Sequence, residues 1–435
     1  MPPLTCQRPI NSPCAMRIVP PLSQRTCGIV ANATVATLAT LVTIAALAAY
    51  TGAAFAAPFV PTSDLLPLER LSTKPGESVR SSQSSRAMRA LLARDPKNVD
   101  LAVRIAQTYV SRARSESDPR LLGQAQAALG AWWAQSEPPV PVLLLRATIR
   151  QSIHDFNPAR RDLDQAVKRE PGNAQAWLTL ATLQQVTGDA KAAAESCRKL
   201  VPITLPLISI TCMAGVDGAR GQAAPAYDAL NSAIAASEAA RRDSVGVRTW
   251  ALTLQAELAE RLARPADAER LYQASLALDP ADAYTIAAYS DFLIDAGRAS
   301  EVMTLIPAST RADVLLLRRA LAAKLTASPD ASDVAKDLGE RFAASAARGD
   351  RVHLREEARF ALAIKNAPPE ALELALANWQ VQKEPLDARI ALEAALAAGQ
   401  ASAAAPILTW IDSTRLQGTK LAQLAVQVKA QAKAQ

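Results

Sequence analysis

Only two histidines, His154 and His353, are available for metal binding or acid–base chemistry in the 435 residues of the chain. His353 precedes Glu356 and Glu357 in "HLREE", so one helical face could offer an imidazole and carboxylates. Two kinds of ligand without a third more often form a surface ion-pair cluster than a metal site. His154 falls in "SIHDFNP", a predicted turn between paired helices, where we expect a solvated side chain. Neither histidine predicts a metal centre or a catalytic base.

The other motifs that could do chemistry are incomplete. The stretch "GVDGARG" (215–221) is glycine-rich like a phosphate-binding loop, but it lacks the Lys-Ser/Thr ending and follows a predicted helix rather than a strand. The sequence has no Gly-x-Ser-x-Gly and no Cys-x-x-Cys. The carboxylates show only ordinary helix-surface spacing. We therefore predict a protein that is not an enzyme and has no cofactor and no metal.

Five cysteines divide between two parts of the chain. Cys6, Cys14 and Cys27 belong to the N-terminal segment, whereas Cys197 and Cys212 lie in the main body. If the body is exported to an oxidising compartment, these two residues could form a disulfide. A pair of buried free thiols on helices is an equally good interpretation.

The N-terminal segment is typical of an export signal. No charged residue occurs between Arg25 and Asp64, and the apolar stretch "GIVANATVATLATLVTIAALAAY" is followed by small residues that end at Ala56. This pattern predicts a leader over residues 1–56, cleaved near Ala56, with translation starting at Met1 or Met16. The apolar stretch is also long enough for an uncleaved membrane anchor. Either alternative predicts a periplasmic or other extracytoplasmic location.

The rest of the chain has the composition of a helical protein. A linker rich in Pro and Ser is predicted over residues 57–85, and amphipathic helices separated by Pro and Gly follow it. Ala and Leu dominate, and aromatic residues make up only 4%. The net charge of +7 is dispersed without a long basic run, which does not favour nucleic-acid binding.

Residue types recur every 34 positions along this helical part. One such series contains Leu143, Ala147, Ala159, Leu163 and Ala166, and its counterparts 34 residues later are Trp177, Ala181, Ala193, Cys197 and Leu200. A second series contains Leu252, Ala256, Ala268 and Tyr272, followed at the same spacing by Ile286, Ser290, Val302 and Ile306. The repeating unit is a pair of helices, and one pair cannot bury its apolar face without stacking on its neighbours.

These residues resemble the tetratricopeptide repeat (TPR) family, in its exported bacterial type. "AWLTLATLQQVTGDAKAAAESC" carries the large, small and Gly positions of the repeat, and "AERLYQASLALDP" carries its second helix. The resemblance implies an all-α fold, an α-solenoid of roughly nine antiparallel helix pairs over residues 86–418. The best units are 140–173, 174–207, 249–282 and 283–311. Residues 419–435 are predicted to form a capping helix.

The resemblance also implies where a partner would bind. Ligands of this family lie in the groove formed by the first helix of each pair. Carried over position by position, this predicts a partner-binding groove made of Gln175, Leu178, Thr182, Gln185, Trp250, Thr253, Glu257, Glu260, Tyr284, Asp291 and Asp295. The acidic residues and the aromatic rings of Trp250 and Tyr284 could hold a basic, extended segment. The alternative is that these aromatic residues only pack and that the acids form a solvated face.

The sequence therefore predicts a non-enzymatic scaffold of the cell envelope that binds another envelope protein. An accessory subunit that delivers substrate or cofactor to an envelope enzyme or transporter is the alternative. The identity of the partner is not encoded in any motif.

Overall fold

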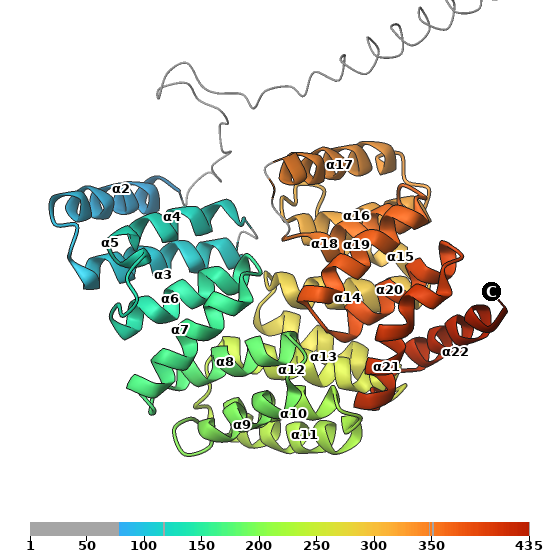
Figure 1. Ribbon diagram of the computed structural model, residues 1–435, viewed down its shortest axis with the longest axis horizontal. Coiled ribbons are helices and arrows are strands. Elements are labelled where there is room, and N and C mark those ends of the chain that lie inside the picture. The colour runs from blue at the N-terminus through green and yellow to red at the C-terminus, as the bar shows by residue number, and fades with distance from the viewer. Residues whose placement is uncertain (1–77, 116–117, 348, 350–351, 435) are drawn as a thin grey trace, which may run out of the picture. The chain divides into compact units, whose positions relative to one another are not determined.

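The computed structural model describes residues 78–115, 118–347, 349 and 352–434, and every regular element within them is a helix (Figure 1). Consecutive helices pack against each other as pairs, which confirms the predicted all-α solenoid of TPR-like units. The elements are α2 (Ser78–Arg94), α3 (Val99–Ser115), α4 (Arg120–Ala128), α5 (Gly130–Trp133), α6 (Val140–Ser152), α7 (Phe156–Arg169), α8 (Ala174–Val186), α9 (Ala190–Leu200), α10 (Pro206–Gly218), α11 (Ala223–Ala240), α12 (Val245–Arg261), α13 (Pro265–Leu278), α14 (Ala283–Asp295), α15 (Ala299–Leu305), α16 (Asp313–Leu325), α17 (Ala331–Ala347), α18 (Leu354–Ala363), α19 (Pro368–Val381), α20 (Pro385–Ala397), the 3₁₀ helix η1 (Ala401–Ala404), α21 (Ala405–Thr414) and α22 (Thr419–Ala434).

The four best predicted units each contain one helix pair, and their boundaries have local causes. Asn173 caps α8 by accepting a hydrogen bond from the amide of Ala176, and Asp189 caps α9 through the amide of Ala192. Between these helices Gly188 has a φ of +86°, a left-handed conformation that ends α8 without a Cβ clash. A Cβ at Gly188 would also lie 2.9 Å from Cδ of Lys383, so another segment of the chain approaches this turn closely.

The small residues of the repeat lie where helices cross. Ala147, Ala181 and Ala256 are all essentially inaccessible to solvent, and Tyr272 fills the space between α13 and its neighbours. Because a methyl side chain lets two helix backbones approach, these positions allow the tight crossing that the pattern predicts. A larger side chain at any of these three positions would force the two helices apart.

The sequence also predicts a leader and a linker at the N-terminal end and a capping helix at the C-terminal end. The predicted leader over 1–56 and most of the linker over 57–85 lie outside the described residues, whereas α2 already begins at Ser78. The C-terminal helix α22 occupies the position predicted for the capping helix. Among the residues described, no helix has the length and apolar composition needed to cross a bilayer.

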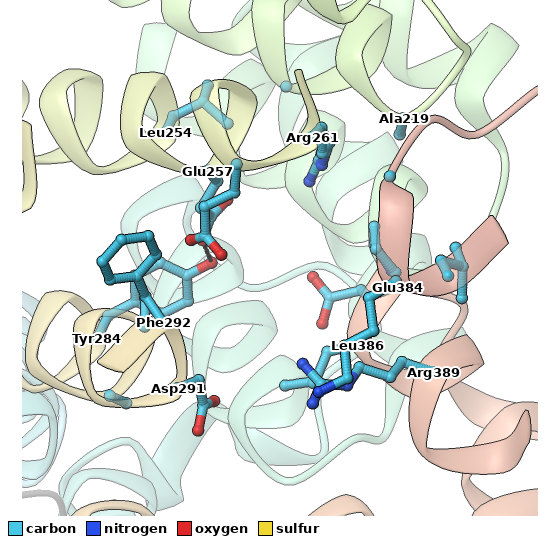
Figure 2. Close-up of a pocket in the computed structure, with 18 of the residues that line it drawn as sticks. Ala219, Leu254, Glu257, Arg261, Tyr284, Asp291, Phe292, Glu384, Leu386 and Arg389 are labelled. Carbon is cyan, nitrogen blue, oxygen red and sulfur yellow. Dashed lines mark hydrogen bonds between the residues drawn. The ribbon is translucent and has the colours of Figure 1, made fainter. Parts of the chain in front are cut away.

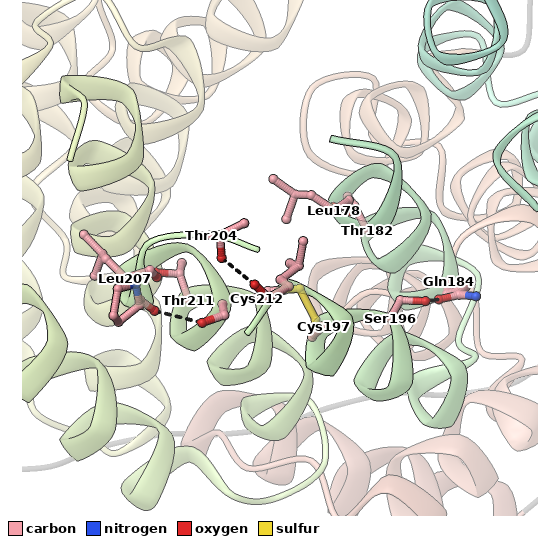
Figure 3. Close-up of a disulfide and its surroundings, with 12 residues drawn as sticks. Leu178, Thr182, Gln184, Ser196, Cys197, Thr204, Leu207, Thr211 and Cys212 are labelled. Atoms are coloured by element: carbon pink, nitrogen blue, oxygen red, sulfur yellow. Dashed lines mark hydrogen bonds between the residues drawn. A yellow bond between two sulfur atoms is a disulfide. The ribbon is translucent and has the colours of Figure 1, made fainter. Parts of the chain in front are cut away.

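Cys197 and Cys212 form a disulfide that joins α9 to α10, and both residues are buried (Figure 3). The bond closes a loop over a sequence separation of 15 residues. The chain-entropy model assigns such a closure about 3 kcal/mol of stabilisation. It ties together two successive repeat units at the point where the pattern changes from the clear unit at 174–207 to a degenerate one.

Helices far apart in the sequence also meet. The backbone amide of Lys383, between α19 and α20, donates to the carbonyl of Val186 at the end of α8, at 2.8 Å. The amide of Ala223 at the start of α11 donates to Oε1 of Gln417, between α21 and α22, at 3.0 Å. These contacts bring the last repeats against α8 to α11.

The expectation of a solvated His154 was wrong. Its Nε2 lies 3.2 Å from Nε2 of Gln382, a residue 228 positions later, and its ring stacks on Phe156. Burial is the main reason that the pKa of His154 falls to about 4, which keeps the imidazole neutral. The turn is a contact between distant repeats rather than an exposed loop.

Candidate functional site

A cavity of about 1340 Å³ lies between the first helices of successive pairs and the last repeats (Figure 2). Residues of α8, α10, α12 and α14 line one part of it, and residues of α16, α18, α20 and the α21–α22 segment line the other. Its apolar lining includes Trp250, Leu254, Leu386 and Trp410. The inner surface of the solenoid is thus largely surrounded by its own chain.

Eight of the eleven predicted groove residues line this cavity. They are Thr182, Gln185, Trp250, Glu257, Glu260, Tyr284, Asp291 and Asp295.

The other three predicted groove residues lie elsewhere. Gln175 is exposed outside the cavity, where its Nε2 donates to Oγ1 of Thr179. Leu178 packs against the apolar cluster that surrounds the disulfide. Thr253 is buried between helices, where its hydroxyl bonds to those of Ser275 and Thr285. The helical wheel of α12 places position 253 against the second helix of its own unit, so the carried-over position was wrong for this residue.

The two aspartates on α14 are neutralised by the chain itself. Asp291 accepts from Arg318 of α16 at 2.8 Å and from Arg359 of α18 at 2.6 Å. Burial alone would raise the pKa of Asp291, but the charges of these two arginines outweigh it and hold the pKa at about 2.

Asp295 is held in the same way at the next turn of α14. It accepts from Arg389 of α20, at 2.7 Å, and from Lys420 of α22. Burial opposes the ionisation of Asp295, yet the bonds from Arg389 and Lys420 lower its pKa below the usual value. The carboxylates of α14 therefore attach the last repeats to the middle of the array.

The two glutamates on α12 have a different environment. Glu257 accepts from the hydroxyl of Tyr284 at 2.6 Å, and Glu260 accepts from the hydroxyl of Tyr272. Burial raises the pKa of Glu257, and burial together with neighbouring carboxylates raises that of Glu260 to about 7. These acids carry less negative charge near neutral pH than their residue type suggests.

The predicted acidic groove for a basic segment is corrected by these contacts. Asp291 and Asp295 already bind basic side chains of this chain, and Glu257 and Glu260 are hydrogen-bonded to tyrosines. Three of the four cationic partners, Arg359, Arg389 and Lys420, were missed because they lie 68 to 125 residues after their aspartates in the sequence. A repeat spacing of 34 carries no information about contacts between non-adjacent units.

Trp250 and Tyr284 make contacts within the chain and also line the cavity. Trp250 packs against the cluster around the disulfide and also lines the cavity. Tyr284 is 63% exposed and directs its hydroxyl to Glu257. Part of each aromatic surface therefore remains available inside the cavity.

The second histidine, His353, lies beside an aromatic ring. The ring of His353 lies 6.1 Å from that of Phe342, and the residue lines a smaller cavity with Glu356. Within the described ranges, no group of three His, Cys, Asp or Glu residues has an arrangement that could hold a metal ion.

Helix pairs with a 34-residue period, crossing at buried alanines and lining a common inner surface, are now established for this chain. It is a TPR-like helical solenoid. No family model and no curated protein matches the TPR-like chain in sequence. Its structure is similar to that of PilF of Pseudomonas aeruginosa, with 18% identity and a TM-score of 0.35, over 48% of this chain and 94% of PilF.

Other solved structures show comparable likeness to the TPR-like solenoid. A tetratricopeptide repeat protein of Parabacteroides merdae has 11% identity and a TM-score of 0.33, over 66% of this chain and 98% of that one. Yeast Tom70 has 11% identity and a TM-score of 0.37, over 81% of this chain and 85% of its own.

Proposed function

We propose that this protein is a non-enzymatic scaffold that binds an extended segment of a partner protein in the cavity. The observation that carries the proposal is the cavity itself, about 1340 Å³ and lined by the first helices of successive units. Pockets for single small molecules usually measure roughly 300–1,000 Å³. A space above that range is suited to several consecutive residues of a polypeptide.

The lining has the composition expected of a protein-binding surface. Trp250, Tyr284 and Trp410 supply large aromatic surfaces, which dominate binding energy at protein interfaces. Polar groups such as Thr182 and Gln185 on α8 can bond to the backbone of an extended segment. Rigid helices hold these side chains in place before binding, which limits the entropy lost on association.

We further propose that the scaffold acts outside the cytoplasm, in the cell envelope. The leader-like sequence over residues 1–56 supports export. The Cys197–Cys212 disulfide is compatible with it, because such bonds persist in oxidising compartments. The partner would then be another envelope protein.

Site-specific photo-crosslinking in cells that express the protein tests this function. A photoreactive residue at Thr182, which is exposed and lines the cavity, is compared with one at Glu195, which is exposed on α9 outside it. We expect the Thr182 position to give an adduct that mass spectrometry assigns to one short segment of one protein. Identical adducts from the two positions, or none from Thr182, would contradict binding in the cavity.

A further inference from the structure

The cationic side chains that line the cavity fall into two groups. Arg318, Arg389 and Lys420 pair with the aspartates of α14, and Arg355 pairs with Glu384 and Asp387. Three other cations of the lining make no ion pair with any described residue: Arg261, Arg264 and Lys383. The guanidinium of Arg264 lies over the ring of Tyr227, 5.1 Å from its centroid. Arg261 and Lys383 have no such ring partner among the described residues.

Arg261 also lacks a hydrogen-bond partner for a buried atom. Its Nη1 is inaccessible to solvent and donates to no hydrogen-bond acceptor among the described residues. The close fit explains its position, since a Cβ on Gly218 of α10 would lie only 2.9 Å from this Nη1. A buried donor of a charged group that stays unsatisfied costs about 1–3 kcal/mol or more. Figure 2 shows the guanidinium pointing into the space that Glu257 and Glu384 also face.

The carboxylates that line the cavity do not satisfy these two cations. Glu257 lies one turn before Arg261 on α12 and senses its charge, yet it accepts its hydrogen bond from Tyr284. Glu356 instead interacts electrostatically with Arg355. Because burial also raises the pKa of Glu257 and Glu260, the negative charge near α12 is reduced further.

Lys383 approaches the cavity from a different element. Its stem packs over Gly188 in the turn between α8 and α9, and its backbone amide is fixed by the carbonyl of Val186. The stem is therefore held while the ammonium group has no acidic partner among the residues described. Arg261 and Lys383 are thus two positioned cations supplied by separate parts of the lining.

We propose that the segment bound in the cavity is acidic, with carboxylates that pair with Arg261 and Lys383. Apolar side chains of the same segment would lie against Trp250 and Leu254 on α12. Charge complementarity favours this occupant, since Asp291, Asp295 and Glu384 already pair with basic side chains of this chain, whereas Arg261 and Lys383 have no such partner among the described residues. The inference rests on the proposed function and names the chemistry of the partner.

Selection from a random library of twelve-residue peptides tests the inference on the purified protein. The retained peptides are sequenced for the parent and for the double variant Arg261→Ala, Lys383→Ala. The double variant Lys199→Ala, Arg220→Ala removes the same charge from exposed positions outside the cavity and serves as the control. We expect peptides enriched in Asp and Glu from the parent and the control, with affinity at least tenfold weaker for the cavity variant.

A second measurement uses the parent alone and does not depend on the folding of a variant. Changing every Glu and Asp of the best retained peptide to Gln and Asn should weaken its binding at least tenfold. If the retained peptides are neutral or basic but are lost with Trp250→Ala, the acidic inference is overturned while cavity binding stands. If no retained peptide responds to any cavity substitution, both the inference and the proposed function are overturned.

Discussion

Glu257 on α12 and Asp291 on α14 are separated by one repeat of 34 residues and occupy equivalent positions, yet their environments are opposite. Asp291 is held as an anion between Arg318 and Arg359, with its pKa at about 2. Glu257 has a tyrosine hydroxyl as its hydrogen-bond partner, and burial raises its pKa. The repeat determines where each carboxyl group lies, and distant helices determine whether it is charged.

The same contrast recurs one turn later. Asp295 and Arg261 are also equivalent positions, 34 residues apart. Asp295 binds Arg389 and Lys420, whereas Arg261 has no ion-pair partner among the described residues. The α14 surface is therefore used to hold the last repeats in place, whereas the α12 surface retains a cation without an ion pair. We propose that this second region of the cavity binds the partner.

The largest effect is expected from matched carboxyl-to-amide changes at the first pair. Asp291→Asn should lower the free energy of unfolding at pH 7 by about 3 kcal/mol, because it leaves two largely buried arginines without their anion. Glu257→Gln should change it by less than about 1 kcal/mol, since hydrogen bonding to Tyr284 can persist. Urea denaturation measures both. Equal losses would show that the two positions do not differ as described.

The pH dependence of Glu260 gives the next effect. Its folded-state pKa of about 7 lies above the ordinary glutamate value of 4.5, so its ionisation destabilises the fold as pH rises from 4.5 through 7. The groups that face it are Tyr272 of α13, Glu257 of α12, and Asp291 and Asp295 of α14. Glu260→Gln should therefore raise the free energy of unfolding by about 2 kcal/mol at pH 8 and change it little at pH 4. A gain of the same size at both pH values would contradict this environment.

The smallest effect is expected at Asp295, whose partner Lys420 is partly exposed. Asp295→Asn should cost about 1 kcal/mol at low salt, and the loss should shrink in 1 M NaCl because salt screens such pairs. The equivalent change Arg261→Gln removes no ion pair and should not lower the unfolding midpoint. A loss at Asp295 that does not depend on salt would mean that the bonds to Arg389 and Lys420 do not hold the α14 surface.

The fold could be predicted from the sequence because its information is local. The small residues at Ala147, Ala181 and Ala256 and the Gly and Pro positions recur at a fixed period, and each acts on neighbouring helices. The resemblance to the repeat family placed eight of the eleven predicted groove residues correctly on the cavity lining, since residues one or two turns apart on a first helix face the same side. Thr253 was misplaced because the family position does not specify the rotation of this helix.

The charge of the cavity could not be predicted in this way. Arg359, Arg389 and Lys420 come from degenerate units and meet α14 across separations of 68 to 125 residues. The hydrogen bond of His154 likewise involves Gln382, 228 residues away. Contacts of this kind follow from the way many units stack, and no short motif encodes them.

The claim that the last repeats line the cavity by pairing with α14 is tested most directly by a double-mutant cycle on Asp291 and Arg359. The variants are Asp291→Asn, Arg359→Gln and their combination, and the measured quantity is the free energy of unfolding in urea. Because the two side chains lie 2.6 Å apart, we predict a coupling energy of at least about 1 kcal/mol. A coupling energy near zero would mean that α18 does not lie against α14, and the cavity and the binding proposed for it would be contradicted.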